Sequence, residues 1–403
     1  NERPGGMLTY GIPSFKLQKD VIEAEVEVIR LMGAEFRYGV EVGRDVTLDE
    51  LRAQGFKAFY VAIGCQGGRL AGIPGEDAED VTVAVDFLRE VNSGKIDALP
   101  GRTIVVGGGN VAIDVARNAC RLGSEHVEMF CLESEAQMPA SEEERREAIE
   151  DGAHISCGWG PKEVHLDEAG HVRGITFKRC TRVFDDEGRF APEYDENDLR
   201  RVDADRVVMS IGQSIVWGDL LAGSKVELGR GQGALADPQT YQTAEPDIFV
   251  GGDVYTGPSF AIDAIAAGHE AAVSIHRFVQ PGSTLTIGRN QRRYTALDRD
   301  DVVIESYDNA SREVAHVDRE REKAAPFSEY VETFTEEQVR AETARCLGCG
   351  ASIVDPNKCI GCGLCTTKCA FDAIHLDRDR PECSTMVKYE QKLPSLGKYA
   401  LKR

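Results

Sequence analysis

The chain lacks any long hydrophobic run. No apolar stretch in its 403 residues approaches the roughly 20 residues that a membrane-spanning helix needs. A positively charged segment followed by an apolar one, the pattern of a secretory signal, is also missing from its start. We therefore expect a soluble, cytoplasmic protein with no membrane insertion.

Positive charge is scarce as well. Lys and Arg number 47 against 68 Asp and Glu, which gives a formal net charge of -21. This balance repels phosphate backbones and anionic lipid surfaces, so it argues against nucleic acid or membrane partners. A small basic group near the end is either a solvated tail or a docking site for an acidic partner subunit; it consists of Lys388, Lys392, Lys398, Lys402 and Arg403.

The chain has no histidine cluster, and none of its eight histidines stands at a metal-ligand spacing. Upstream of the last stretch it also lacks closely spaced cysteine pairs. We expect the scattered thiols there to be buried and structural, which argues against a dithiol-disulfide reductase. They are Cys65, Cys120, Cys131, Cys157 and Cys180.

What the chain does have is a dense cysteine array near its end. Cys359-Ile-Gly-Cys362-Gly-Leu-Cys365-Thr-Thr-Lys-Cys369 has the C-x2-C-x2-C-x3-C spacing of a [4Fe-4S] site. A zinc ribbon is the alternative, but zinc sites favour two separated pairs over three evenly spaced thiolates. The array therefore predicts electron transfer.

Three further cysteines lie close to this array, namely Cys346, Cys349 and Cys383. In two-cluster ferredoxins the fourth cysteine of one array ligates the other cluster. By that logic Cys359, Cys362 and Cys365 share one cubane, and Cys369 joins Cys346 and Cys349 in a second. Cys383 can complete one of the two. Seven local thiolates thus predict one or two [4Fe-4S] clusters, with one cluster a ligand short.

The remaining sequence indicates an α/β protein of two or three domains. Apolar residues at helical spacing predict a helix over 22–29, which Gly33 ends. A strand is expected at 59–63, and a βαβ unit with a strand at 102–106, a helix at 111–122 and a strand at 127–132. Antiparallel strands are expected over 162–202, buried strands at 206–211 and 248–250, and a long helix over 259–279.

A glycine-rich turn opens the predicted βαβ unit. Gly107-x-Gly109-x-x-Ala112 fits the dinucleotide fingerprint, in which a small third residue lets helix and strand pack closely. The helix that begins near Asn110 and Val111 would receive the pyrophosphate at its N-terminus. Glu133, at the end of the next strand, can accept hydrogen bonds from both ribose hydroxyls and repel a 2′-phosphate. This favours NAD(H) over NADP(H), although Arg145 and Arg146 offer cations for a phosphate.

Together these motifs resemble the glutamate synthase small-subunit family, which includes the flavin subunits of NADH-dependent ferredoxin:NADP oxidoreductases and the reductase part of dihydropyrimidine dehydrogenase. The resemblance runs from Asn1 to about Val279. Besides the block from Gly107 to Asp114, it rests on Pro4-Gly5-Gly6-Met7-Leu8, Gly11-Ile12-Pro13, Ala62-Ile63-Gly64, Met138-Pro139, Ile211-Gly212-Gln213 and Gly251-Gly252-Asp253. Glu336 to Gly350 is similar to the start of that family's cluster-binding domain, displaced to the C-terminus.

The resemblance implies two interleaved Rossmann-like dinucleotide-binding domains of glutathione-reductase-like fold and a small C-terminal ferredoxin-like domain. The expected divisions are 1–100 for the first part of the FAD domain, 101–213 for the NAD(P) domain, 214–280 for the second FAD part, 281–334 for an extended linker, and 335–403 for the iron-sulfur domain and tail. The family's upstream glycine-rich FAD unit is expected to be missing, supplied by a longer chain or by another polypeptide.

The resemblance also implies the flavin contacts. Asp253 would hold the ribityl or diphosphate side, although a turn-forming role is the alternative. Ala261 lies at the start of a helix whose dipole would favour the reduced, anionic flavin. The other implied cofactor contacts are Gly5, Gly6, Met7, Leu8, Gly11, Ile12, Ala62, Gly64, Gly212 and Gly252.

The sequence thus predicts an FAD and iron-sulfur enzyme subunit that moves electrons between NADH and [4Fe-4S] clusters or a ferredoxin. No catalytic acid or base is expected, because hydride transfer to a flavin needs none. The expected partners are other subunits of an oxidoreductase complex, electron-bifurcating in one version, or a ferredoxin. The alternatives are a glutamate synthase small subunit and a non-catalytic iron-sulfur relay whose flavin site is vacant.

Overall fold

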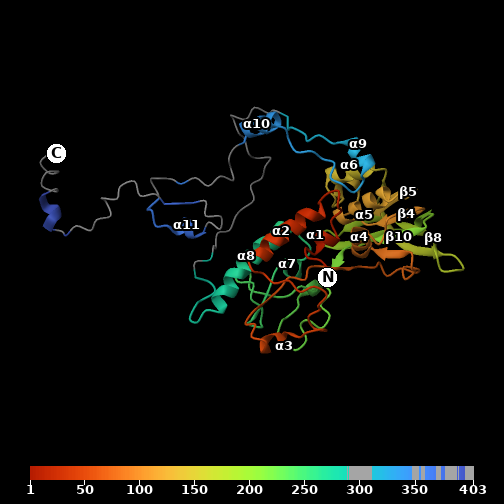
Figure 1. The fold of residues 1–403 in the computed structure, drawn as a ribbon. Helices are drawn as coiled ribbons and strands as arrows, with labels where there is room; N and C mark the ends of the chain where they lie inside the picture. Colours follow the sequence, from red (N-terminus) through yellow and green to blue (C-terminus); the bar gives the residue numbers. More distant parts are fainter. Residues whose placement is uncertain are drawn as a thin grey trace. The chain divides into compact units, whose positions relative to one another are not determined.

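The computed structural model describes residues 1–287, 289, 311–346, 354, 359–368, 374–376, 388 and 390–394. The chain divides into two compact units. Unit 1 comprises Asn1–Val303 with Val314–Phe334, and unit 2 comprises Ile304–Glu313 with Thr335–Arg403. Figure 1 labels the main elements of both. Unit 1 combines helices with parallel strands, which confirms the α/β class.

A five-stranded parallel sheet organises one half of unit 1. Its order is β3-β10-β4-β5-β6, with bounds Val81–Val83, Arg206–Met209, Arg102–Val106, His126–Cys131 and His154–Cys157. The strands are short apolar runs because both faces of the sheet are covered. On one face α4 (Ala84–Asn92), α5 (Asn110–Arg121) and α6 (Glu142–Glu150) contribute to a core that contains Phe87, Val115 and Met129. The predicted βαβ unit is confirmed as β4, α5 and β5.

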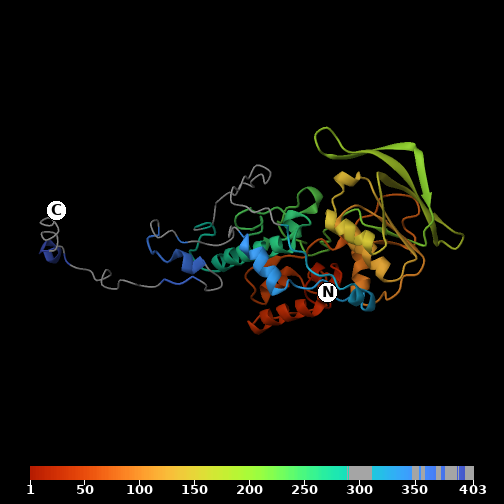
Figure 2. The ribbon, with the colours of Figure 1, turned by 90° about the horizontal axis from the view of Figure 1, so that it is seen from above.

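Three antiparallel strands cover the other face of this sheet. They are β7 (Trp159–Leu166), β8 (Val172–Phe184) and β9 (Phe190–Val202), paired in that order. The Phe177 ring of β8 stacks on Phe130 of β5, with 3.9 Å between ring centroids. The long β8–β9 hairpin is the yellow-green ribbon in Figure 2. The antiparallel excursion predicted over 162–202 is therefore confirmed.

A second, smaller set of strands forms the other half of unit 1. β1 (Phe59–Val61) pairs in parallel with β12 (Ile248–Val250), and β2 (Gly67–Gly68) pairs antiparallel with β11 (Gln213–Ser214). Val61, Ile248 and Val250 form its core. Gly33 follows the predicted helix α2 with φ +102°, as a C-terminal cap requires. The other elements are α1 (Met7–Tyr10), α2 (Lys19–Leu31), α3 (Leu48–Ala53), η1 (Glu135–Gln137), η2 (Arg230–Gln232), α7 (Asp253–Thr256) and α8 (Ala261–Phe278).

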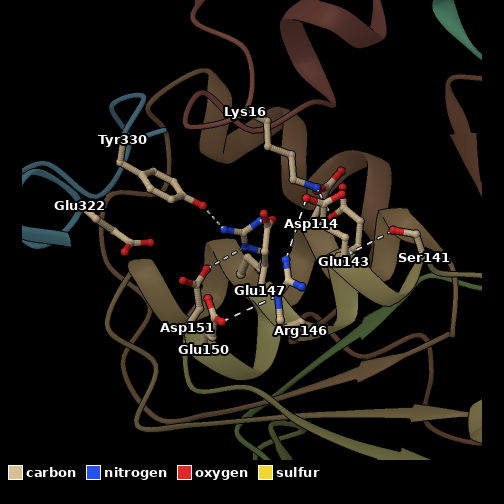
Figure 3. A network of polar contacts seen from close by, with 12 residues as sticks. Lys16, Asp114, Ser141, Glu143, Arg146, Glu147, Glu150, Asp151, Glu322 and Tyr330 are labelled. Atoms are coloured by element: carbon tan, nitrogen blue, oxygen red, sulfur yellow. Dashed lines mark hydrogen bonds and ion pairs between the residues drawn. The ribbon is translucent and has the colours of Figure 1, made fainter. Parts of the chain in front are cut away.

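A buried ionic network joins α5 and α6 to two distant segments of unit 1 (Figure 3). Arg117 of α5 is 1% exposed and pairs with Asp151, 2.8 Å away, and with Glu147. The guanidinium groups of Arg117 and Arg121 lie 4.8 and 4.2 Å from the centroid of the Phe15 ring. Cation-π contact and ion pairing together compensate the burial of these two charges.

The same network holds the segment 314–334 against unit 1. Arg117 Nη2 donates to Tyr330 Oη at 2.5 Å, and Tyr330 is only 5% exposed. Arg121 pairs with Glu322 of α9 (Arg319–Ala324) at 2.6 Å and donates to the Pro326 carbonyl at 2.7 Å. We expected an extended linker over 281–334. Its part 314–334 instead contains a helix and a buried tyrosine that pack on unit 1.

Unit 2 contains α10 (Glu336–Ala344) and α11 (Leu364–Lys368). Thr335 caps α10 with a reciprocal pair of hydrogen bonds to Gln338, which is a capping box. Among the residues that the structure describes, no helix is long and apolar enough to cross a membrane.

Candidate dinucleotide, flavin and iron-sulfur sites

The glycine turn after β4 has the geometry of a pyrophosphate site. Gly107 has φ +145°, and a Cβ there would lie 2.2 Å from the Ser210 carbonyl oxygen at the end of β10. Gly109 caps α5, and a Cβ on it would meet no atom within 4 Å. Asn110 and Val111, the first two residues of α5, line a cavity, so an anion bound there would meet the N-terminus of the helix. Ala112 is fully buried, as close packing of helix on strand requires.

Glu133 follows the end of β5, and its side chain lies beside this turn. Its Oε2 lies 3.0 Å from where a Cβ on Gly108 would stand. The carboxylate is therefore beside the loop that would hold the pyrophosphate, within reach of an adjoining ribose. The two arginines considered as phosphate ligands are engaged elsewhere: Arg145 donates to the Glu135 carbonyl at 2.7 Å, and Arg146 faces Glu143 and Glu150.

A cavity of about 1100 Å³ lies at the predicted dinucleotide site. It is lined by the glycine turn, by Glu133 and by Gly212, which follows β10. The segment Pro258–Phe260 just before α8 also lines it. Sequence reasoning missed several other lining residues, among them Leu70, Ile73, Trp159, Lys178, Tyr194 and Ser210. This volume suits a large dinucleotide, since small-molecule sites are usually smaller.

Four of the residues implied for the flavin lie just after the carboxyl ends of two strands: Ala62 and Gly64 follow β1, and Gly252 and Asp253 follow β12. Because these strands are parallel neighbours, the residues that follow them emerge at one edge, where α/β proteins bind ligands. A Cβ on Gly64 would lie 4.0 Å from Asp253 Oδ2. Asp253 Oδ1 accepts from the Ser259 N-H at 3.3 Å. Gly252 has φ +67°, a backbone conformation that other residues rarely adopt. This glycine directly precedes Asp253 and so sets the direction of the chain at the carboxylate.

The glycine-rich segment from Gly5 to Ile12 forms a separate loop around α1. A Cβ on Gly5 would lie 2.2 Å from Thr9 Oγ1, which donates to the Pro4 carbonyl at 2.6 Å. Lys19 Nζ donates to the Leu8 carbonyl at 2.9 Å and to that of Ile12. Burial and the nearby Arg3 lower the pKa of Lys19 to about 8. Met7, Leu8 and Gly11 belong to this loop, which does not line the large cavity.

Two of the scattered cysteines lie side by side, which sequence spacing does not reveal. Cys131 and Cys157 are register partners on β5 and β6, and their sulfur atoms are 3.7 Å apart. Burial and the neighbouring Cys157 raise the pKa of the Cys131 thiol. Cys65, Cys131 and Cys180 are buried, whereas Cys120 and Cys157 are half-buried. The raised pKa lowers the reactivity of the Cys131 thiol. The structural role of the scattered cysteines stays a prediction.

The cysteine array belongs to unit 2. Cys346, Cys359, Cys362 and Cys365 are exposed, and Cys365 lies within α11. Gly361 and Gly363 flank Cys362 with φ +65° and +77°, which reverses the chain between thiols. Over the described part of the chain, no three Cys, His, Asp or Glu side chains converge on a metal position. Cys349, Cys369 and Cys383 lie outside the described residues, so the ligand assignment stays a prediction.

The parallel sheet and the glycine turn give unit 1 the architecture of a dinucleotide-binding protein. Residues 4–268 match the family described as "Pyridine nucleotide-disulphide oxidoreductase", and the chain belongs to this family. Residues 352–375 match the "4Fe-4S binding domain". The chain thus combines a region of the pyridine nucleotide oxidoreductase family with a match to an iron-sulfur binding domain.

Two curated relatives illustrate the similarity. The "NADP(+)-dependent formate dehydrogenase subunit beta" of Moorella thermoacetica is 33% identical over 86% of this chain and 49% of its own length. The "Glutamate synthase [NADPH] small chain" of Escherichia coli K12 is 33% identical over 68% of this chain and 61% of its own length. The chain therefore spans about half to three fifths of these relatives.

Among solved structures, FprA from Mycobacterium tuberculosis, as its His57Gln mutant, matches with a TM-score of 0.56 and 19% identity. That match covers 68% of this chain and 76% of FprA. At this identity the likeness shows the fold alone, and it agrees with the predicted two-domain dinucleotide-binding architecture.

Proposed function

We propose that this chain exchanges a hydride with NADH, passes the electrons through FAD, and delivers them singly to one or two [4Fe-4S] clusters, or runs this path in reverse. FAD supplies the step between a two-electron donor and one-electron acceptors. The observation that carries the proposal is the cavity of about 1100 Å³ that runs from Glu133 and the Gly107 turn to the segment before α8.

In this proposal the nucleotide occupies the glycine turn, with its pyrophosphate on the N-terminus of α5. Glu133 accepts from the ribose hydroxyls, and its charge opposes a 2′-phosphate. The names of some relatives state NADP or NADPH, but those proteins need not share this residue. The position of Glu133 beside Gly108 supports NADH as the preferred nucleotide for this chain.

FAD would lie at the edge formed by β1 and β12, with Asp253, Gly64 and Gly252 against its ribityl or diphosphate part and Ala261 at the head of the adjoining helix. The loop of Gly5 to Ile12 would lie along the flavin. Ile262 and Ile265 on α8 are 67% and 54% exposed. These side chains present an apolar surface beside the proposed flavin edge.

The clusters would be held by the seven cysteines of the last stretch, as thiolates. The names of two relatives describe beta subunits of multi-subunit enzymes, which supports a role within an oxidoreductase complex or with a ferredoxin. A glutamate synthase small subunit remains the second candidate, favoured by the match to the E. coli small chain.

The test is anaerobic mixing of the FAD-loaded full-length protein with NADH or NADPH while flavin absorbance is followed. NADH should bleach the flavin faster than NADPH. Glu133→Ala should reduce the ratio of the NADH rate to the NADPH rate by about tenfold or more, since a hydrogen bond to a charged group contributes about 1.5–3 kcal/mol. Glu135→Ala, a neighbouring carboxylate that does not line the cavity, is the control. Faster bleaching by NADPH would refute the NADH preference, and no bleaching by either nucleotide would favour the non-catalytic relay.

A further inference from the structure

The segment 314–334 is closed on itself by backbone contacts. Val317 and Val331 form an antiparallel bridge, and the Asp318 N-H donates to the Tyr330 carbonyl at 2.9 Å. The helix α9 lies between the two paired stretches. The segment is thus a compact hairpin with a helix at its turn, and we call it the anchor hairpin. Neither nucleotide binding nor cluster ligation accounts for it.

Both ends of the anchor hairpin continue directly into unit 2. The residue before it, Glu313, and the residue after it, Thr335, belong to that unit. The Glu313 N-H donates to Glu342 Oε1 of α10 at 2.6 Å, and Thr335 caps the same helix. Cys346, a predicted cluster ligand, follows α10 two residues after its end. Whatever holds the anchor hairpin therefore also holds the chain that carries the predicted cluster ligands.

Tyr330 makes the main contact between the anchor hairpin and α5 (Figure 3). It is buried, its hydroxyl accepts a hydrogen bond from Arg117, and its ring centroid lies 5.1 Å from the Arg121 guanidinium. The side chains of both arginines are almost fully buried. Buried tyrosine and arginine side chains are the ones that most often dominate the binding energy of an interface.

Matched charges and one apolar contact surround this centre. Glu322 of α9 pairs with Arg121 at 2.6 Å, and both side chains are largely buried. Arg319 pairs with Glu150 of α6 at 2.6 Å, where both side chains are partly exposed. Phe327 packs against the core that α4, α5 and α6 share with the parallel sheet. A buried centre with a polar, partly exposed rim is the anatomy of a protein–protein interface.

We propose that Phe15, Arg117 and Arg121 form a docking site for the anchor hairpin, and that this docking keeps unit 2 attached without the covalent connection between Arg289 and Ser311. The segment that fits the site carries an aromatic hydroxyl and a neighbouring carboxylate, which match the two buried guanidinium groups. The inference rests on the proposed function in one respect, namely that unit 2 carries the electron-accepting clusters. Docking then keeps the clusters at a high effective concentration beside their electron donor.

The experiment places a protease recognition sequence between Arg289 and Ser311 of the full-length protein and cuts the chain there. In gel filtration under argon, the two fragments should elute together, at the position of the uncut protein. Tyr330→Ala should raise the dissociation constant of the fragments more than tenfold, as truncation of a dominant interface residue does. The uncut Tyr330→Ala protein should still elute as one species.

A matched pair of milder variants keeps the proposal testable should Tyr330→Ala fold poorly. Glu322 and Glu320 are both carboxylates of α9, but Glu322 pairs with the buried Arg121, whereas Glu320 is exposed. Glu322→Gln should weaken the association of the cut fragments about tenfold, because it leaves a buried charge without its partner. Glu320→Gln should leave the association unchanged.

The proposal is overturned if the cut wild-type fragments separate, if cut Tyr330→Ala stays together as tightly as the cut wild type, or if Glu320→Gln weakens the association as much as Glu322→Gln does. Gel filtration requires no reduction of flavin or cluster, so a failure of docking is distinguishable from a failure of electron transfer. Fragments that elute together but exchange no electrons would support the docking and count against the proposed function.

Discussion

Asp114 on α5 carries a carboxylate into the interior of unit 1. Its Oδ1 lies 2.6 Å from Lys16 Nζ, on the segment that follows the Gly5 to Ile12 loop. Burial raises the pKa of Asp114 to about 6, because the attraction of Lys16 only partly offsets the lost hydration. The folded protein therefore resists ionisation of this group between its ordinary pKa of 3.8 and about 6.

Urea unfolding measured over a series of pH values tests the raised pKa of Asp114. The favourable contribution of Asp114 is fully present below pH 3.8 and is lost as pH rises through about 6, since the folded pKa is the higher one. Wild-type protein should thus lose stability relative to Asp114→Asn over this window. Asp205→Asn is the control, because hydrogen bonding from the Arg102 N-H lowers the pKa of Asp205 in the folded protein. Asp205 therefore stays ionised in the folded protein over this window, and the difference in unfolding free energy between this variant and wild type should stay nearly constant. A constant difference for Asp114→Asn would contradict the account.

At the residue scale, the sequence predicts the groups that a local motif places. Gly107, Gly109, Ala112 and Glu133 lie within one βαβ unit, so the fingerprint positions them without knowledge of the rest of the fold. Cys131 and Cys157 lie 3.7 Å apart because β5 and β6 are neighbours in the sheet. Strand order is a tertiary property, which residue spacing alone does not contain.

At the element scale, the segment 314–334 connects to unit 1 through charge rather than apolar periodicity. The helix α9 has the sequence Arg-Glu-Arg-Glu-Lys-Ala, which by pattern alone predicts a solvated segment. Its Glu322 instead reaches Arg121, and Tyr330 reaches Arg117. The pattern of apolar residues therefore could not predict the burial of these two arginines, whereas it did predict the helices and strands of the sheet.

The hydrogen bond between Tyr330 and Arg117 predicts a measurable loss of stability when the Tyr330 hydroxyl is removed. Tyr330→Phe leaves Arg117 Nη2 without its buried partner, which should cost about 1–3 kcal/mol of unfolding free energy. The matched control is Tyr38→Phe, because the Tyr38 hydroxyl lies 3.3 Å from Arg30 Nη2 at an exposed site. Its cost should stay below about 0.5 kcal/mol. Equal urea midpoints for the two variants would mean that Tyr330 does not hold the segment.

At the scale of the whole molecule, the chain contains two units whose chemistry differs. Unit 1 provides a dinucleotide cavity and the implied flavin edge, and unit 2 provides the thiolates of a matched 4Fe-4S binding domain. The flavin contacts and the cluster ligands are predictions from motif and resemblance. What makes them one function is the claim that electrons pass between NADH and the clusters by way of FAD.

An electron count tests that claim most directly. The FAD-loaded full-length protein is reduced with dithionite, freed of excess reductant under argon, and mixed with excess NAD⁺ while NADH formation and the cluster EPR signal are followed. Flavin alone supplies electrons for about one NADH per chain, and two connected clusters raise the yield to about two. We predict a yield above one NADH per chain, with loss of the reduced-cluster signal and a yield that falls toward one in Cys362→Ser. A yield of one in the wild type, with the clusters still reduced, would contradict the account.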